Sequence, residues 1–313
     1  MSQLNETSII PKNQSRLIKK LKKETYRKKV WDQLVKNKVA SFPNPYGRIP
    51  NFKGAAQAAA KLLELEEFKS SQSVEVNPDK PLEASRMIVL ENGKELYVPV
   101  PGLQEYVLKK LSVQDGTTIK RTVSRWGIDN TGQKIDITDT IRIDLLVLGS
   151  VAVSKEGYRI GKGKGYADIE YALLKEMKAI DDETVIVTVV HDLQVFDTLP
   201  KEAFKEHDVP VDYILTPTQI IKTENRLPRP AGIYWELLSQ KQINSIKVLR
   251  TLKKRHKQNN PSADTSETKP AVTHKERKKA KLTKTGNENS SGETVLSENT
   301  ENIPPKKIEK EKT

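Results

Sequence analysis

Apolar and polar positions along the body of the chain alternate between helix-like and strand-like patterns. Residues 15–38 place Leu, Val and Trp side chains about one helical turn apart with Lys and Arg between them, which predicts an amphipathic helix. Residues 54–68 are rich in Ala and Leu and contain no helix breaker, which predicts a second helix. Short apolar runs at 74–76, 87–90 and 96–100 follow, and such runs are typical of strands.

The second half of the body has longer apolar runs. Residues 144–153 (DLLVLGSVAV) are apolar without alternation, which is typical of a strand buried on both faces. The pattern then predicts a helix over 167–179, a strand over 184–190, a short helix near 201–206 and a strand over 211–215. Because strands separated by helices form βαβ units, the predicted fold class is α/β, three-layered, with a mostly parallel sheet and helices on both faces.

The two ends of the chain differ from the body in charge. Residues 1–30 hold nine Lys/Arg and two Asp/Glu, and residues 253–313 hold fifteen and nine, so the stretch between them is neutral although the net charge is +13. From Pro261 onward large apolar residues are nearly absent, which predicts a disordered segment. We therefore divide the chain into a flexible N-terminus (1–14), an α/β domain (15–250) and a disordered basic tail (251–313).

Composition excludes several classes of function. The chain has no cysteine, which excludes disulfides and thiol catalysis and favours a reducing compartment, here predicted to be the cytoplasm. No run approaches eighteen apolar residues, and no apolar segment follows the N-terminal lysines, so neither a membrane partner nor a secretory signal is expected. The basic cluster at 275–281 is read first as solvated tail, with nuclear targeting or phosphate contact as alternatives.

The segment most informative about function is GYRIGKGKGYAD, residues 157–168. Its glycines Gly161, Gly163 and Gly165 follow a predicted strand and precede a predicted helix. Glycine lets backbone N–H groups approach an anion, and a helix N-terminus adds partial positive charge. The glycine spacing is that of neither a Walker A loop nor the dinucleotide fingerprint, and by spacing alone a plain strand-to-helix turn explains it equally well.

Charged residues beside the glycines favour phosphate binding over a plain turn. Arg159, Lys162 and Lys164 supply positive charge within the loop. Asp168 stands in the first turn of the predicted helix, where its carboxylate could hold Mg²⁺ through oxygen. Together these residues indicate an anion site that accepts a metal-bound phosphate.

The same segment, taken with the strand before it, resembles the hallmark of the 5-formyltetrahydrofolate cyclo-ligase family. That hallmark is an Asp-led apolar strand followed by Arg-Leu-Gly-x-Gly-x-Gly-Tyr-Tyr-Asp. Lys23-x-x-x-Arg27 resembles the family's N-terminal basic pair, and the run from Gln194 to Thr216 resembles its closing segment. The resemblance covers roughly residues 20–222. Three further segments resemble a divergent subfamily: 48–54, 76–81 and 149–153.

The resemblance implies a reaction and a role for individual residues. In the family, ATP phosphorylates the formyl oxygen of 5-formyltetrahydrofolate, and ring closure then gives 5,10-methenyltetrahydrofolate, ADP and phosphate. The implied cofactors are therefore ATP and Mg²⁺. The residues implied for each role are Lys23, Arg27, Gly161, Gly163, Lys164 and Gly165 for the nucleotide, Asp168 and Asp208 for the metal, and Arg159 and Tyr166 for catalysis.

The folate side of the family pattern is missing from this sequence. Pro-Asp-Lys-Pro at 78–81 stands where the family has Glu-Ile-x-Thr, Gly149-Ser150 replaces Pro-Gly, and Ala167 replaces the second Tyr. A site built to hydrogen-bond a polar substrate loses powers of ten in rate when one partner is removed. The sequence therefore favours a divergent member that keeps a nucleotide-phosphate site and binds RNA or another polyanion through its basic ends, with folate the least supported ligand. An active ATP-dependent 5-formyltetrahydrofolate cyclo-ligase is the alternative.

Overall fold

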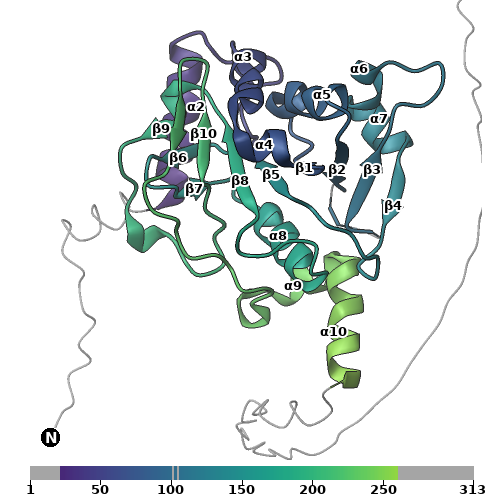
Figure 1. Ribbon diagram of the computed structural model, residues 1–313. Helices are drawn as coiled ribbons and strands as arrows, with labels where there is room; N and C mark the ends of the chain where they lie inside the picture. The colour runs from purple at the N-terminus through teal and green to yellow at the C-terminus, as the bar shows by residue number, and fades with distance from the viewer. Residues whose placement is uncertain (1–21, 101, 104–105, 260–313) are drawn as a thin grey trace, which may run out of the picture. The chain divides into compact units, whose positions relative to one another are not determined.

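The computed structural model describes residues 22–100, 102–103 and 106–259, and within them the central element is an eight-stranded mixed sheet (Figure 1). The strand order is β11-β10-β8-β5-β1-β2-β3-β4; the five strands from β10 to β2 are parallel, and β11, β3 and β4 pair antiparallel at the edges. The strands of this sheet are β1 (Ser73–Val76), β2 (Glu95–Pro99), β3 (Leu108–Leu111), β4 (Gln133–Ile135), β5 (Leu145–Leu148), β8 (Val185–Val189), β10 (Tyr213–Leu215) and β11 (Ile220–Lys222).

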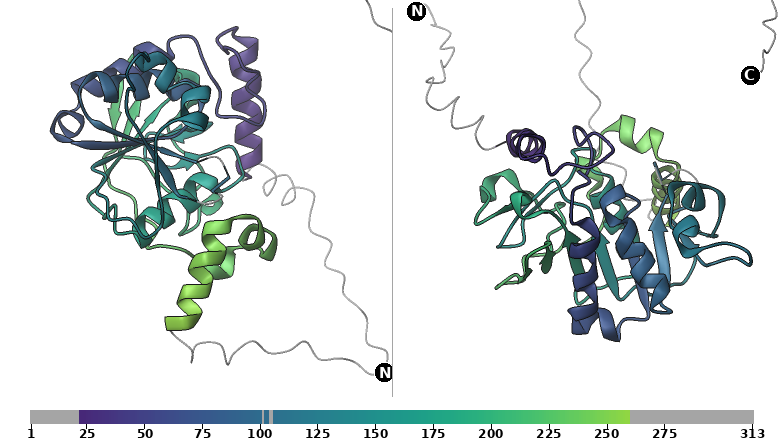
Figure 2. Two further views of the ribbon diagram at one scale, coloured as in Figure 1. Left: turned by 90° about the vertical axis from the view of Figure 1, so that its right-hand side faces the viewer. Right: turned by 90° about the horizontal axis from the view of Figure 1, so that it is seen from above.

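Helices cover both faces of this sheet, so the predicted three-layered α/β fold with a mostly parallel sheet is confirmed (Figures 1 and 2). On one face lie α3 (Ala55–Ala60), α4 (Glu66–Ser70), α5 (Glu83–Glu91), α6 (Ile119–Thr122) and α7 (Arg125–Asn130), and on the other α8 (Tyr166–Glu176), α9 (Gln240–Ser245) and α10 (Lys247–Asn259). Short 3-10 helices join the elements: η1 (Lys61–Glu64), η2 (Lys80–Leu82), η3 (Asp192–Gln194), η4 (Lys201–Ala203) and η5 (Trp235–Leu237).

The continuous apolar run of β5 follows from this three-layered arrangement. Successive strand side chains point to opposite faces. Leu145 and Val147 pack into the core under α3 and α5, and Leu146 and Leu148 pack into the core under α8. A strand covered on both faces has no solvent side, and its sequence therefore shows no polar alternation.

The N-terminal helix α2 (Lys23–Lys36) packs against a second, smaller sheet. That sheet has the order β7-β6-β9, formed by β7 (Arg159–Ile160), β6 (Ala152–Ser154) and β9 (Val195–Phe196). Val30, Trp31 and Leu34 of α2 are buried in a third core with residues of these strands, while the lysines of the helix face outward or toward the cleft described below. Helix 15–38 is thus confirmed over the part that the structure describes.

Three predicted elements differ from the structure. The helix expected over 54–68 is interrupted, since Leu65 is extended and buries its side chain between η1 and α4. The run at 87–90 lies in α5 rather than in a strand, because its apolar residues cover the sheet from outside. The strand expected over 144–153 is two strands in different sheets: β5 ends at Leu148, the chain bends at Val151, and β6 begins at Ala152.

The C-terminal boundary predicted at residue 250 falls inside α10. Leu249 and Leu252 of this helix are buried against the core on the α8 side, so packing continues past residue 250. The predicted flexible N-terminus, the basic cluster at 275–281 and the rest of the predicted tail beyond residue 259 lie outside the described residues. Among the described helices, none has the length and apolar character needed to span a membrane.

Candidate functional site

The main cleft opens at the carboxyl ends of β1 and β5. From β1 the strand order runs outward in one direction through β2, and from β5 in the other through β8, so this is the point where the connections reverse direction. Ligands of open α/β sheets bind at such points, because the loops after the two strands diverge and leave a crevice. Here the backbone N–H of Gly149, after β5, donates to Oδ1 of Asn77, after β1, at 3.1 Å. The cleft above this bond has a volume of about 620 Å³.

All ten residues implied by the family resemblance line this one cleft. They come from five places in the fold: α2, β7, the loop between β7 and α8, the start of α8, and the loop after η4. The set is Lys23, Arg27, Arg159, Gly161, Gly163, Lys164, Gly165, Tyr166, Asp168 and Asp208. Residues separated by up to 185 positions in the sequence are therefore brought together as the resemblance requires.

The glycine loop has the backbone conformation that its residue types predict. Gly163 and Gly165 have φ of +92° and +70°, in the left-handed region that favours glycine. Nothing lies within 4 Å of the position that a Cβ at Gly165 would take, so this glycine is open toward the cleft. At Gly163 a Cβ would come within 3.0 Å of Arg27 Cζ, and Arg27 Nε donates to the carbonyl oxygen of Gly161 at 2.7 Å. Helix α2 thus holds the loop in shape.

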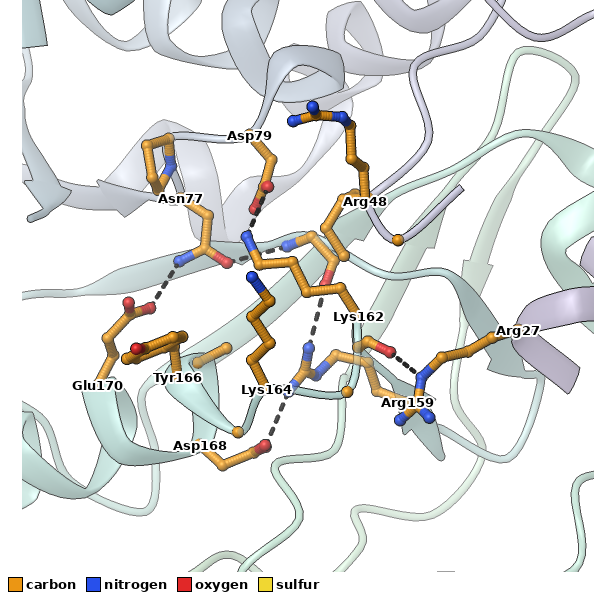
Figure 3. A pocket seen from close by; sticks show the side chains of 18 of the residues that line it. Arg27, Arg48, Asn77, Asp79, Arg159, Lys162, Lys164, Tyr166, Asp168 and Glu170 are labelled. Carbon is orange, nitrogen blue, oxygen red and sulfur yellow. Dashed lines mark hydrogen bonds and ion pairs between the residues drawn. The ribbon is translucent and has the colours of Figure 1, made fainter. Parts of the chain in front are cut away.

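Positive side chains approach the loop from several sides (Figure 3). Lys164 extends into the middle of the cleft and makes no ion pair with any described residue. Lys162 is paired instead with Asp79 across the cleft at 3.0 Å. Lys23 pairs with Asp208 at 2.5 Å, and its Nζ lies 4.7 Å from the centre of the Phe204 ring. Eight Lys or Arg and four Asp or Glu line the cleft, so its excess charge is positive.

Arg159 is buried in the wall of this cleft and holds neighbouring parts of the fold together. Its side chain is 2% exposed, and each guanidinium nitrogen has a partner within the protein. Nε donates to Val209 O at 3.2 Å, Nη1 to Gly149 O at 3.0 Å, and Nη2 to Asp168 Oδ1 at 2.8 Å. These bonds tie the ends of β5 and β7 to α8. The catalytic roles predicted for Arg159 and Tyr166 stay predictions.

The two predicted metal ligands fit a hard cation that also binds phosphate. Asp168 uses Oδ1 for Arg159 and for the N–H of Val209, and Asp208 uses Oδ2 for Lys23 and for the N–H of Lys205. Each carboxylate keeps a second oxygen. Mg²⁺ is usually held by one or two carboxylates together with substrate phosphates and water. No cluster of three or more His, Cys, Asp or Glu suited to a metal occurs among the described residues, so the remaining ligands would be phosphate oxygens and water.

A buried polar group on the β1 side of the cleft was missed from the sequence. Asn77 Nδ2 donates to Glu75 Oε1 at 3.2 Å and to Glu170 Oε2 at 3.3 Å, joining β1 to α8. Burial raises the pKa of Glu75 well above its usual value, and the nearby Glu170 raises it further. Burial, with Asp79 as the second cause, raises the pKa of Glu170 to about 7. This side of the cleft therefore holds carboxyl groups that resist ionisation.

One sequence signal could have found part of this group. Asn77-Pro78-Asp79 directly follows a buried strand, which is where open α/β sheets place ligand-binding side chains. Nothing local marks Glu75, because a Val-Glu-Val run is typical of a half-exposed strand. Its burial depends on α8, which lies ninety residues away in the sequence.

The fold and the cleft define an α/β protein with a cationic glycine loop at the carboxyl edge of a parallel sheet. Residues 19–217 match the 5-formyltetrahydrofolate cyclo-ligase family, and the chain belongs to that family. The predicted resemblance is confirmed by this match.

Curated relatives and one solved structure extend the comparison. The chain is 43% identical over 240 residues to the methenyltetrahydrofolate synthase domain-containing protein of Mus musculus and 42% identical to that of Homo sapiens. It spans 64% and 62% of their lengths, and the matches cover 75% of this chain. The solution structure of 5,10-methenyltetrahydrofolate synthetase from Aquifex aeolicus is 26% identical, with a TM-score of 0.43 over 69% of this chain and 99% of that one.

Proposed function

We propose that the cleft binds the polyphosphate of a nucleotide such as ATP together with Mg²⁺. The observation that carries this proposal is the open glycine loop with Arg27 and Lys164 beside it and Lys23 lining the same cleft (Figure 3 shows Arg27 and Lys164). Backbone N–H groups at the start of α8 supply further donors to an anion. Mg²⁺ held by Asp168 and Asp208 would neutralise phosphate oxygens, and Arg159 would keep Asp168 oriented toward it.

Calorimetry with Mg²⁺ and ATP tests this proposal directly. Lys164→Ala removes a charged partner of the phosphates and should weaken ATP binding about tenfold or more. Lys120→Ala, at an exposed lysine of α6 outside the cleft, is the matched control and should leave affinity unchanged. No measurable binding at millimolar ATP, or equal affinities for the two variants, would contradict the proposal.

For the folate reaction we infer loss rather than retention. The Lys162–Asp79 ion pair crosses the cleft at the segment where the family's Glu-Ile-x-Thr is missing. A Cβ at Gly149 would lie 3.0 Å from Ile49 Cγ1 and 3.2 Å from Asp79 Oδ2, so side chains already crowd this end. With 5-formyltetrahydrofolate and ATP, the protein should give no increase in methenyl absorbance. Turnover at a rate comparable to that of a family enzyme would instead establish the active cyclo-ligase.

A second candidate function, RNA or polyanion binding, is favoured by α10. Residues 240–259 contain no acidic residue. Val248, Leu249 and Leu252 face the core, which leaves Arg250, Lys254 and Arg255 exposed. A cationic face of this kind binds nucleic-acid phosphates without sequence preference.

Salt dependence tests the contribution of α10. Replacing its three exposed cations with Gln should lower affinity for single-stranded RNA and reduce the slope of log K against log salt by about 0.7 for each phosphate that these cations neutralise. Three Lys→Gln changes, at positions 28 and 36 of α2 and at its N-cap residue Lys22, provide a comparison of equal charge. An unchanged slope in the α10 variant would exclude this helix as the contact surface.

A further inference from the structure

A second pocket, with a volume of about 730 Å³, lies beside the main cleft. One wall is formed by the loop around η4 and the start of β7, and the other by the segment 227–237 that includes η5. Its size falls in the range of small-molecule sites. Its apolar lining consists mainly of Tyr158, Phe204, Pro210, Leu227, Tyr234 and Leu237. We call it the Arg229 pocket, after the charged residue described next.

Arg229 lines this pocket with hydrogen-bonding capacity left unused. Its side chain is 5% exposed, and only Nη2 is paired, with Asp212 Oδ2 at 2.6 Å. Nε and Nη1 are buried and have no hydrogen-bond partner among the described residues. Buried donors without a partner cost free energy, and charged ones cost more. These two nitrogens therefore require an acceptor that this part of the chain does not supply.

Asp212 does not fill the hydrogen-bonding capacity of Arg229, because it serves several donors. Arg226 Nε approaches its Oδ1 at 3.4 Å, and the N–H of Ile186 donates to its Oδ2 at 2.8 Å. Arg226 is also paired with Glu183 at 2.7 Å, so the two arginines are matched by two carboxylates and Arg229 lacks acceptors rather than charge. An anionic acceptor makes the stronger, charge-assisted hydrogen bond to a guanidinium.

Tyr171 adds a further buried donor near Arg229. Its hydroxyl also has no hydrogen-bond partner among the described residues. Burial raises the pKa of this phenol to about 12, against the positive charge of Arg229, so the hydroxyl keeps its proton at neutral pH. Tyr171 does not line the pocket, so its hydroxyl belongs to the buried surroundings of Arg229 and not to the ligand site itself.

The apolar wall of the pocket suits a planar group. The rings of Tyr158 and Phe204 stack with centroids 4.7 Å apart and a tilt of 32°. Leu237 is 46% exposed on the facing wall, which leaves its side chain available for contact. Aromatic and aliphatic surfaces that face each other in this way bury a flat apolar body favourably.

The wall formed by 227–237 is not part of the family match, which ends at residue 217. The matches to the curated relatives cover 75% of this chain. A match of that length reaches past Arg229 wherever in the chain it begins. The pocket therefore combines a wall from the family match with a wall from a segment that follows it. Arg159 and Asp208 line both cavities and separate them.

We propose that the Arg229 pocket binds a small amphipathic anion, in which a carboxylate or phosphate bonds to Arg229 and a planar apolar body packs between Phe204 and Leu237. This site is distinct from the nucleotide-phosphate cleft and goes beyond the function proposed for it.

Naphthoate, naphthyl phosphate and uncharged naphthamide are suitable probes, with binding followed by calorimetry. At least one of the two anions should bind with a Kd below about 1 mM, and the amide should bind about tenfold more weakly because it lacks the charge. The anion that binds more tightly identifies the group for which the pocket is built. Leu237→Asp removes an apolar contact to the ring of every probe and places a negative charge at the exposed wall, so it should weaken the amide and weaken the anion severalfold more than the amide.

Two controls keep the test specific. Leu63→Asp changes a leucine of nearly equal exposure, 44%, on η1 outside the pocket, and should have no effect. Lys164→Ala in the main cleft should leave naphthyl anion binding unchanged, and an ATP titration of the same samples reports separately on the cleft. Absence of anion binding at millimolar concentration, equal binding of the amide, or loss of anion binding in Lys164→Ala would each overturn the proposal.

Discussion

The two sides of the main cleft hold their charges by different means. On the glycine-loop side, exposed backbone and cations surround an open space, and the charged side chains are either unpaired toward the cleft or paired with a single carboxylate. On the β1 side, Glu75, Asn77 and Glu170 form a buried chain of hydrogen bonds. The first side is arranged to receive an anion from outside. The second is satisfied internally and disfavours added negative charge.

Arg159 ties the glycine-loop side to the end of β5, and its removal should have the largest effect on the protein. Arg159→Ala leaves Asp168 and two buried carbonyl oxygens without their partner, and the unfolding free energy should fall by about 3 kcal/mol or more. Chemical denaturation measures this loss. Arg142→Ala breaks an ion pair whose arginine side chain is 54% exposed, and should cost less than about 1 kcal/mol. Equal losses in the two variants would show that Arg159 does not hold the cleft together.

The glycine-loop side was largely predictable from sequence because its information is local. Alternating glycines, a preceding apolar strand and neighbouring cations define a backbone conformation within twelve residues. The strand–helix alternation likewise predicted the three layers and a mostly parallel sheet. Predicted elements differ from the structure where tertiary contacts decide. The run over 144–153 divides because β6 pairs with β7 and β9 in the smaller sheet and not with the neighbours of β5. Glu75 was missed because its burial comes from a helix distant in the sequence.

Within the glycine loop, two Ala substitutions separate backbone strain from contact with α2. In Gly163→Ala the residue keeps a positive φ and its new Cβ lies 3.0 Å from Arg27 Cζ. We expect the unfolding free energy to fall by about 2 kcal/mol and ATP binding to weaken. Gly165→Ala has positive φ but no neighbour within 4 Å, and should cost about 1 kcal/mol. Chemical denaturation of both variants measures the unfolding free energies, and calorimetry measures their affinities for ATP. If Gly165→Ala proves the more damaging to stability, the α2 contact is not what shapes the loop.

On the β1 side, stability should depend on pH through Glu75. Burial raises the pKa of Glu75 in the folded protein, so the folded state keeps a proton that the unfolded chain releases above its usual pKa of 4.5. This contribution lowers the unfolding free energy as pH rises. Glu75→Gln removes this pH-dependent contribution. The unfolding free energy of the variant should exceed that of the wild type by on the order of 1 kcal/mol at pH 7 and should equal it near pH 4. Glu91→Gln at the exposed end of α5 is the control. A gain that is the same at both pH values would argue against a protonated Glu75.

The smallest effect on stability is expected at the Lys162–Asp79 ion pair. This pair joins the two sides of the cleft, and an incoming anion would compete with Asp79 for the lysine. The lysine side chain is 33% exposed, so Asp79→Asn should change stability by less than about 1 kcal/mol. It releases Lys162 toward the phosphates and should tighten ATP binding about threefold, since an exposed charge pair is worth roughly that much. Removing a negative charge from the cleft would also attract an anion without any movement of Lys162. A double-mutant cycle separates the two causes: in the Lys162→Ala background, Asp79→Asn should lose most of its effect if the released lysine binds the phosphates, and keep it if the charge of Asp79 acts alone.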